Sequence, residues 1–191
     1  FYLLGRTMEY LPFNLYLRRP IEGANLSGLR LRVAPHFQSF FSSLGATTVR
    51  SDLSEIYTFM ENGSIEGFGW PIQGFLPDWL KVTRYRVEPG FYNADIHIVF
   101  NLEAWRKLSP EHRKLLEDLM IEFEASNSVE ADAANAATKK AQEQAGVQVI
   151  QLGPEDAKKW TATARDTIWS AIIERSPQNG PKLRKLMVKE N

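Results

Sequence analysis

The most constraining feature of the sequence is a stretch, residues 111–145, that contains neither glycine nor proline. Pro110 opens the stretch at a position typical of the first turn of a helix, and Gly146 closes it with the residue that most often ends one. Larger apolar side chains recur at helical spacing in the first half, and alanines continue the same face in the second half. We therefore predict one continuous helix over residues 110–145.

A helix of this length constrains the whole molecule. At 1.5 Å per residue it would run to about 54 Å, well beyond the roughly 30 Å width of a small domain. It must therefore bridge two bodies, kink, or take part in an oligomer. Heptads are not sustained and the second half is rich in alanine, so we favour a helix that backs two lobes over a coiled coil.

The first third of the chain alternates short apolar runs with helical patterns. Two helical patterns end at Gly45 and Gly63, which supply left-handed stops, and Asp52 is among the residues that offer an N-cap for the second. Strands separated by helices of about ten residues pair in parallel through right-handed crossovers. We therefore predict an α/β sheet that includes strands at residues 29–33, 47–49 and 65–68.

The remainder of the chain adds further elements to this pattern. Residues 96–100 form an apolar run that predicts a buried strand, and Asn101 and Ser109 mark the starts of two helices. After the long helix, residues 147–152 predict another strand, and Pro154 begins an amphipathic helix. The tail predicts a polar turn followed by a short helix.

Composition excludes several classes of function. With 43% hydrophobic and 24% charged residues, the chain has the profile of a folded globular protein. Lys plus Arg and Asp plus Glu both number 23, so there is no basic excess to neutralise a nucleic-acid backbone, and no nucleic-acid partner is expected. The absence of cysteine excludes disulfides, thiol catalysis and cysteine-ligated zinc. The chain begins at Phe1 inside an apolar run, so we expect an incomplete or processed N-terminus.

Arg32 is the first candidate for ligand binding. It lies at the end of an alternation of apolar residues and arginine, residues 29–33, and Pro35 starts a helix directly after it. Open sheets bind their ligands outside the carboxyl ends of the strands, and a guanidinium fork matches the two oxygens of a carboxylate. We therefore predict organic-acid binding at Arg32, with a structural salt bridge as the alternative. Arg30, on the same face of the strand, is expected to be solvated or ion-paired.

Three ordered segments resemble one known family. They are LSGLRLRV at residues 26–33, SEIYTFMENG at residues 54–63 and SIEGFGWP at residues 64–71. Their order and spacing are similar to those of the solute-binding subunits of tripartite ATP-independent periplasmic (TRAP) transporters, the dicarboxylate-binding DctP type. The long helix and its lead-in, EAWRKL at residues 103–108, resemble that family as well, so the likeness covers nearly the whole chain.

The resemblance implies an α/β protein of the two-lobed periplasmic binding protein type, with mixed sheets and a long helix that spans both lobes. Such proteins reside in the periplasm, close around an organic acid and deliver it to a membrane permease. The chain resembles the C-terminal three fifths of the family. We accordingly expect residues 1–92 to form an α/β segment of the second lobe, residues 93–125 to return to the first lobe and start the long helix, and residues 126–191 to complete the helix and the second lobe.

The resemblance also assigns roles in the ligand site. In the family, the arginine at the position of Arg32 anchors the ligand carboxylate, and the residue at the position of Leu53 packs on the ligand. The position of Trp70 is often an asparagine that bonds the ligand. An indole offers instead a flat apolar face and one N–H donor. We therefore expect a monocarboxylate with an apolar, aromatic or 2-oxo portion, rather than sialic acid or a C4-dicarboxylate.

Alternatives and additional candidates accompany this assignment. Trp70 can also be a core residue that closes a turn. Asn93 and Asp95 alternate along one face of a predicted strand and can supply either polar ligand contacts or hinge hydrogen bonds. Tyr57, one turn into a helix, can turn its hydroxyl toward the cleft, although packing is the commoner role for such a residue.

An enzyme is not expected. Asp95 and His97, together with Glu66, come nearest to acid–base machinery or a metal site, but no nucleophile motif, phosphate loop or zinc-protease motif accompanies them. We expect neither a cofactor nor a metal. Two further alternatives stay open: a ligand-binding sensor domain of the same architecture, and a structural helical assembly around the long helix.

Overall fold

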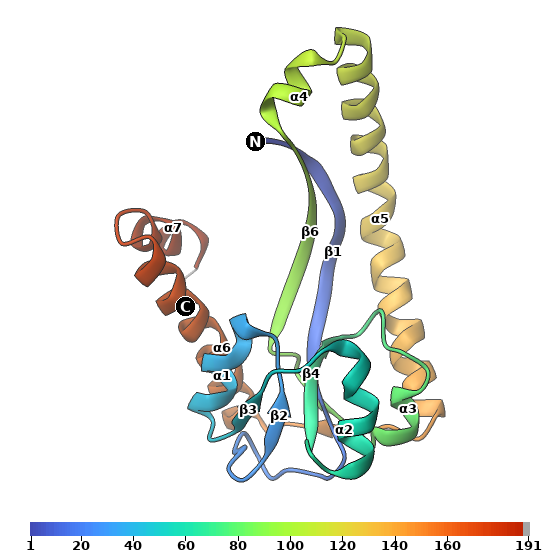
Figure 1. The fold of residues 1–191 in the computed structure, drawn as a ribbon, viewed down its shortest axis with the longest axis vertical. Helices are drawn as coiled ribbons and strands as arrows, with labels where there is room; N and C mark the ends of the chain where they lie inside the picture. Colours follow the sequence, from blue (N-terminus) through green and yellow to red (C-terminus); the bar gives the residue numbers. More distant parts are fainter. Residues whose placement is uncertain (189–191) are drawn as a thin grey trace.

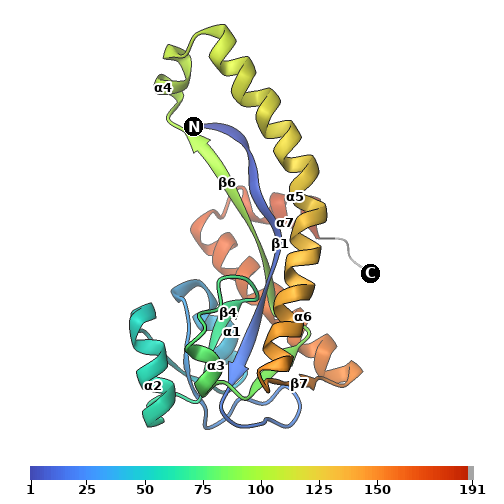
Figure 2. The ribbon, with the colours of Figure 1, turned by 90° about the vertical axis from the view of Figure 1, so that its right-hand side faces the viewer.

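The computed structural model describes residues 1–188, which form an α/β body from which a two-stranded ribbon and a long helix extend (Figures 1 and 2). The strands are β1 (Tyr2–Leu17), β2 (Arg30–Arg32), β3 (Thr47–Val49), β4 (Gly67–Pro71), β5 (Tyr85–Glu88), β6 (Tyr92–Phe100) and β7 (Gln148–Gln151). The α-helices are α1 (Gln38–Ser43), α2 (Ile56–Asn62), α3 (Trp79–Val82), α4 (Leu102–Lys107), α5 (Pro110–Gln144), α6 (Pro154–Arg175) and α7 (Gly180–Met187). Two 3₁₀ helices, η1 (Pro35–Phe37) and η2 (Leu53–Glu55), lead into α1 and α2.

The sheet of the body has the strand order β3-β2-β4-β1-β5-β7. The β3-β2-β4 part is parallel, which confirms the pairing predicted from strands separated by helices. β1 runs antiparallel between β4 and β5, with Leu17 opposite both Gly67 and Tyr85. The sequence patterns do not indicate this strand of 16 residues, which joins the two halves of the sheet.

The sheet is packed on both faces. On one face, η1, α1 and α6 cover a core that includes Phe41 and the fully buried Trp160. On the other face, α2 and α3 cover a core that includes Trp79. Because side chains alternate along a strand, Leu15 and Leu17 of β1 belong to the first core and Tyr16 to the second.

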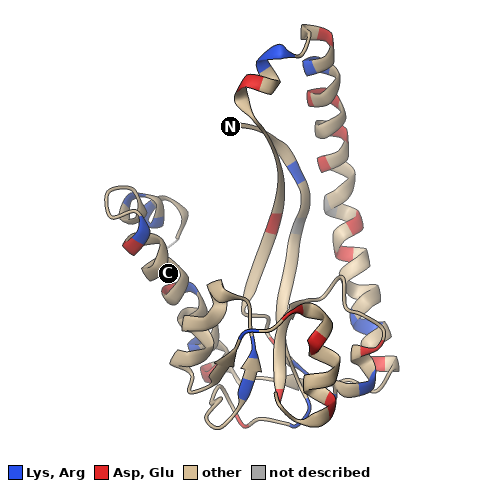
Figure 3. Cartoon of the chain, in the orientation of Figure 1, with Lys and Arg blue, Asp and Glu red and all other residues tan. Residues whose placement is uncertain are grey.

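The predicted strand at residues 96–100 forms as part of β6, but the prediction that it is buried is wrong. Ile96, Ile98 and Val99 are 47%, 37% and 57% exposed. The reason is tertiary: within residues 1–188, β6 pairs with β1 alone and projects with it beyond the body (Figure 1). Figure 3 shows that this ribbon carries few charged residues.

The long helix is confirmed as one continuous helix, α5. Its N-cap is Ser109, whose hydroxyl accepts the His112 N–H at 3.2 Å, and Gly146 follows it with a positive φ of 93°. α5 lies beside β1, and its N-terminal end extends past the start of that strand (Figures 1 and 2). None of the helices within residues 1–188 combines the length and the hydropathy needed to cross a bilayer.

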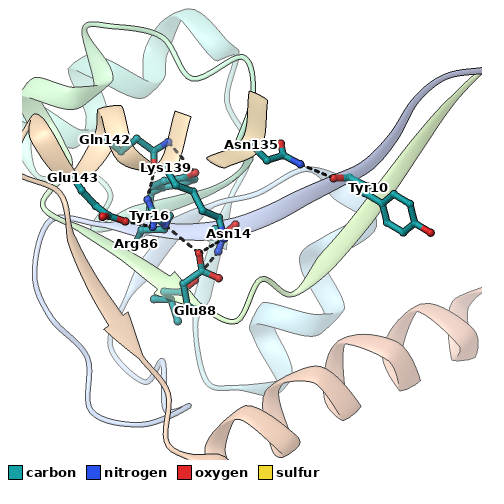
Figure 4. A network of polar contacts seen from close by, with 10 residues as sticks. Tyr10, Asn14, Tyr16, Arg86, Glu88, Asn135, Lys139, Gln142 and Glu143 are labelled. Atoms are coloured by element: carbon teal, nitrogen blue, oxygen red, sulfur yellow. Dashed lines mark hydrogen bonds and ion pairs between the residues drawn. The ribbon is translucent and has the colours of Figure 1, made fainter. Parts of the chain in front are cut away.

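Polar side chains attach α5 to β1. The amide of Asn127 donates to the Thr7 carbonyl and that of Asn135 to the Tyr10 carbonyl, both at 2.9 Å. Figure 4 shows the second of these contacts, close to a buried polar network at the C-terminal end of α5. These bonds satisfy main-chain groups of β1 that strand pairing leaves free, so β1 and α5 form one unit.

Candidate functional site

Three of the predicted ligand residues converge at one end of the sheet. β3, β2 and β4 are adjacent and parallel, so their carboxyl ends lie side by side. Arg32 is the last residue of β2, Trp70 lies near the end of β4, and Leu53 begins η2 shortly after β3. Arg32 is in register with Phe68, two residues before Trp70, so Arg32 and Trp70 project from the same face of the sheet.

The side chain of Arg32 is held in place by one main-chain oxygen. Its Nε and Nη2 both donate to the Ser51 carbonyl, at 3.3 and 3.1 Å. Arg32 is only 9% exposed. Two of the five N–H groups of a guanidinium are used in this way, which leaves three for a ligand.

The segment that presents the Ser51 carbonyl is itself ordered by a helix cap. Asp52 is the N-cap of η2, and its N–H donates to the Glu55 carboxylate at 2.9 Å in a reciprocal capping box. The sequence pattern offers Asp52 as one of several N-cap candidates but does not show what this cap positions. The cap orders the chain next to Ser51, and Ser51 in turn orients the guanidinium.

Electrostatics at Arg32 favour an anion. Burial lowers the pKa of Arg32, and the nearby Asp52 carboxylate opposes this shift. The guanidinium nevertheless stays charged at any physiological pH. Within the described part of the chain, no carboxylate forms an ion pair with Arg32, so the predicted alternative of a structural salt bridge does not occur there. A largely desolvated cation without an ion-pair partner gains most from a bound carboxylate.

Trp70 closes a turn, as the alternative for this residue anticipated. Its indole N–H donates to the Gly74 carbonyl at 3.0 Å. Its ring packs edge-on against Trp79, with ring centroids 5.1 Å apart. The N–H that we expected to be available to a ligand is therefore already bonded, and the half-buried Trp70 offers only its apolar ring.

Asn93 lies at the same end of the sheet as Arg32 and Trp70. Phe13 of β1 is paired with both Pro71 and Tyr92, and the next pair along β6 is Asn93 with Pro12. This register places Asn93 level with the end of β4. Asn93 also lines an open hollow of about 500 Å³ between the start of β6 and α6.

Three further aspects of the predicted site concern the exposure of Asp95 and Leu53 and the direction of Tyr57. Asp95 lies two residues further along β6, on its exposed part. Leu53 is 44% exposed, which suits an apolar contact that is completed by a ligand. Tyr57 is not brought to this end: its hydroxyl donates to Glu61 at 2.8 Å, one turn toward the far end of α2.

Arg30 has the structural role that was expected. Its Nη2 lies 3.8 Å from the Glu66 carboxylate and donates to the Gly63 carbonyl at 2.7 Å. Arg30 and Arg32 lie two residues apart on one strand face, yet only Arg30 has a carboxylate partner within the described residues.

The sequence patterns did not indicate a polar network around the buried Arg86. Arg86, 2% exposed, donates to Glu88 at 3.2 Å and to Gln142 and Glu143 at 2.8 Å (Figure 4). Lys139 completes the network with a contact of 2.9 Å to Glu88. A single arginine between Tyr85 and Val87 in the sequence does not identify its partners on α5.

Comparison with known proteins places these features in a family. A family model described as bacterial extracellular solute-binding protein, family 7 (DctP), matches residues 15–175. A curated relative, Solute-binding protein RD1_1052 of Roseobacter denitrificans, is 29% identical over 109 residues, which are 52% of this chain and 32% of the relative.

Solved structures of TRAP periplasmic solute-binding proteins share the fold. The protein from Desulfovibrio salexigens with bound orotic acid has a TM-score of 0.82 at 23% identity and covers 96% of this chain. The R. denitrificans protein with bound L-galactonate has a TM-score of 0.77 at 22% identity and covers 97% of this chain. A marine metagenome protein in complex with 3-hydroxybenzoate has a TM-score of 0.74 at 19% identity and covers 93%.

The chain spans only part of each of these proteins: 60%, 61% and 59% of their lengths. Over that part, the neighbours confirm the mixed α/β fold of the periplasmic binding protein type with its long helix. The family match and the fold agree with the resemblance found in the three sequence segments. The chain belongs to family 7 of the bacterial extracellular solute-binding proteins, the DctP family of TRAP solute-binding proteins.

Proposed function

We propose that the chain is part of the extracytoplasmic solute-binding subunit of a TRAP transporter and that Arg32 anchors the carboxylate of an organic acid. The single observation that carries this proposal is Arg32 itself: a guanidinium 9% exposed, held by Ser51, with no ion-pair partner within residues 1–188. The family supports binding in the periplasm and delivery to a membrane permease.

The chemistry of the relatives supports a carboxylate ligand. Orotate, L-galactonate, malonate and 3-hydroxybenzoate, which are bound by four of the structural neighbours, each carry a carboxylate. In this chain, Trp70 and Leu53 add apolar surface near Arg32, and the Trp70 N–H is already bonded to Gly74. We therefore propose a monocarboxylate with an aromatic, apolar or 2-oxo portion.

Asn93 and Asp95 are proposed to contribute polar contacts from β6. Asn93 is level with the end of β4, so it approaches the ligand portion opposite to the carboxylate held by Arg32. Asp95, further along β6, is placed for a contact at the rim of the site. Tyr57 is left out of the proposed site because its hydroxyl is bonded to Glu61.

We propose that binding closes two lobes over the acid. In this division, the α/β body carries Arg32, and residues 93–125, together with the first part of β1 that pairs with β6, lead to the part that approaches from the other side. Closure expels water, which strengthens the ion pair because the local dielectric constant falls. The closed shape is then what a permease recognises.

Calorimetry on the two-lobed protein tests the anchor role. A buried charged hydrogen bond contributes about 1.5–3 kcal/mol, so Arg32→Met should weaken binding of 3-hydroxybenzoate or of the acid that co-purifies by about tenfold to a hundredfold. Arg30→Met is the matched control, because Arg30 lies on the same strand face but is paired with Glu66. Unchanged affinity in Arg32→Met, or equal losses in both variants, would reject the proposed anchor.

A further inference from the structure

A second cationic site lies at the end of the sheet opposite to Arg32. β1 ends at Leu17 and β5 begins at Tyr85, and these two residues are paired in register. Arg18 and Arg84 flank the pair, and the Arg84 N–H donates to the Leu17 carbonyl at 2.9 Å. The two arginines therefore extend from neighbouring antiparallel strands at the amino end of β4, whereas Arg32 lies at the carboxyl end of β2.

Arg18 and Arg84 line one hollow. Its volume is about 320 Å³, and α2 and α3 contribute most of its remaining wall. The lining residues are Arg18, Tyr57, Met60, Glu61, Lys81, Val82 and Arg84. A hollow of this size has room for a small anion and its nearest waters.

The charges around the hollow leave an excess of one positive charge. The Glu61 carboxylate, which accepts the neutral Tyr57 hydroxyl at 2.8 Å, offsets one of the two arginine charges, and Lys81 is paired with Asp78 at 2.6 Å. Arg18 and Arg84 form no ion pair with any residue that the structure describes. Two neighbouring cations of like charge repel each other, and an anion between them removes that repulsion and adds hydrogen bonds to both.

Both guanidinium groups have donors to spare. A Cβ atom built on Gly63 would lie 2.7 Å from Nη1 of Arg18, so this side chain rests against the C-terminal end of α2, where partial negative charge favours a cation. Nη1 of Arg84 donates to the Thr83 carbonyl at 3.2 Å. Since each guanidinium has five N–H groups, most of the donors stay free for an oxyanion.

We propose that this hollow is a second anion site, which binds a small, doubly charged oxyanion between Arg18 and Arg84. The ligand must carry oxygen atoms that accept hydrogen bonds from two guanidinium groups at once. Such a group is supplied by an inorganic ion, such as sulfate, or by a short dicarboxylate, such as succinate. The site is separate from Arg32, so occupancy of one does not exclude the other.

Titration calorimetry with sulfate and with succinate, each at an ionic strength kept constant with sodium chloride, tests the proposal. Saturable binding of one of the two is expected, and the tighter one identifies the source of the oxyanion. Arg18→Gln and Arg84→Gln should each weaken binding at least tenfold, because each removes a charged partner. Arg19→Gln is the matched control: Arg19 is exposed like Arg18, but it donates to the Gly28 carbonyl and does not line the hollow. Arg32→Met should retain the binding.

Three outcomes would overturn the proposal. The first is the absence of saturable binding of either anion beyond that of chloride. The second is a loss in Arg19→Gln as large as that in Arg18→Gln, which would mean only a diffuse surface charge. The third is loss of the binding in Arg32→Met, which would assign it to the ligand cleft. Thermal unfolding of each variant without anion shows whether it is folded, and Lys81→Gln gives a further variant with an expected partial loss.

Discussion

At the scale of single residues, the partners of two nearly buried arginines show which of them is available to a ligand. Arg32 and Arg86 are both nearly buried, yet they differ in their partners. Arg86 has two carboxylates and an amide around it, so its charge is compensated within the fold. Arg32 has a single carbonyl. A ligand carboxylate at Arg32 would thus complete an arrangement that Arg86 already has, and this difference is the physical basis for assigning ligand binding to Arg32.

Tyr16 gives a pH-dependent prediction at this scale. Burial raises its pKa well above its ordinary value of 10.0, although the hydrogen bond from Gln142 opposes the shift. The unfolded chain releases the phenolic proton near pH 10, whereas the folded chain keeps it. The free energy of unfolding should therefore fall as the pH rises above 10, by up to about 1.4 kcal/mol per pH unit from this one group.

Denaturant unfolding between pH 8 and 11, compared with that of Tyr16→Phe, measures the contribution of Tyr16. The phenylalanine variant has no hydroxyl to ionise, so its stability should fall less steeply above pH 10. Below pH 10 the variant should be about 1 kcal/mol less stable, because Gln142 loses its acceptor. Parallel curves for the two proteins would show that Tyr16 titrates normally.

At the scale of elements, the attachment of α5 to β1 matters most. A helix of 35 residues with few buried apolar side chains needs other contacts to stay on the sheet. Amide side chains supply them, since each one satisfies a strand carbonyl while the helix keeps its own hydrogen bonds. This arrangement explains why α5 follows the ribbon well beyond the α/β body (Figure 2).

Asn135→Ala tests this attachment. Asn135 is 9% exposed, donates to the Tyr10 carbonyl and accepts from the Gln73 amide, both at 2.9 Å. Its removal leaves two partly buried groups without this partner, so we expect a loss of about 1 kcal/mol in the free energy of unfolding. Glu130→Ala, at an exposed position of the same helix, is the control and should change stability by less than about 0.5 kcal/mol. Denaturant unfolding followed by circular dichroism measures both, and equal effects would contradict the role assigned to Asn135.

At the scale of the whole molecule, the ribbon of β1 and β6 presents an apolar surface. Leu3, Ile96, Ile98 and Val99 are 37–59% exposed on it, and the ribbon carries few charges (Figure 3). α5 supports the ribbon through β1, but these apolar side chains stay exposed beside it. The ribbon is therefore an apolar surface that we expect to associate with other apolar surfaces in solution.

Hydrophobic dye binding tests this expectation in the 191-residue chain. The chain should bind the dye and associate as its concentration rises, and Ile98→Gln with Val99→Gln should reduce both effects severalfold. Leu186→Gln, which changes an 83% exposed residue on α7, should leave them unchanged. A monomer that binds no dye, or an equal response to Leu186→Gln, would show that the ribbon is not an interaction surface. Sedimentation velocity and dye fluorescence are the measurements.

Local chemistry determined much of this protein from the sequence alone. The ends of α5 follow from Ser109, Pro110 and Gly146, because helix caps and turns depend on neighbouring residues only. The parallel β3-β2-β4 unit follows from alternating strand and helix patterns. Together these place Arg32 at a carboxyl end, where the resemblance to TRAP solute-binding proteins also placed a ligand anchor.

The tertiary structure decided what depends on residues distant in the sequence. β1 is a strand of 16 residues because it pairs with three other strands, and no local pattern encodes those partners. Residues 96–100 are apolar but exposed, because burial depends on what packs against a strand rather than on its composition. The indole N–H of Trp70 donates to the Gly74 carbonyl. The residue type determines which hydrogen bonds a side chain can form, but only the folded chain determines which partner lies within reach.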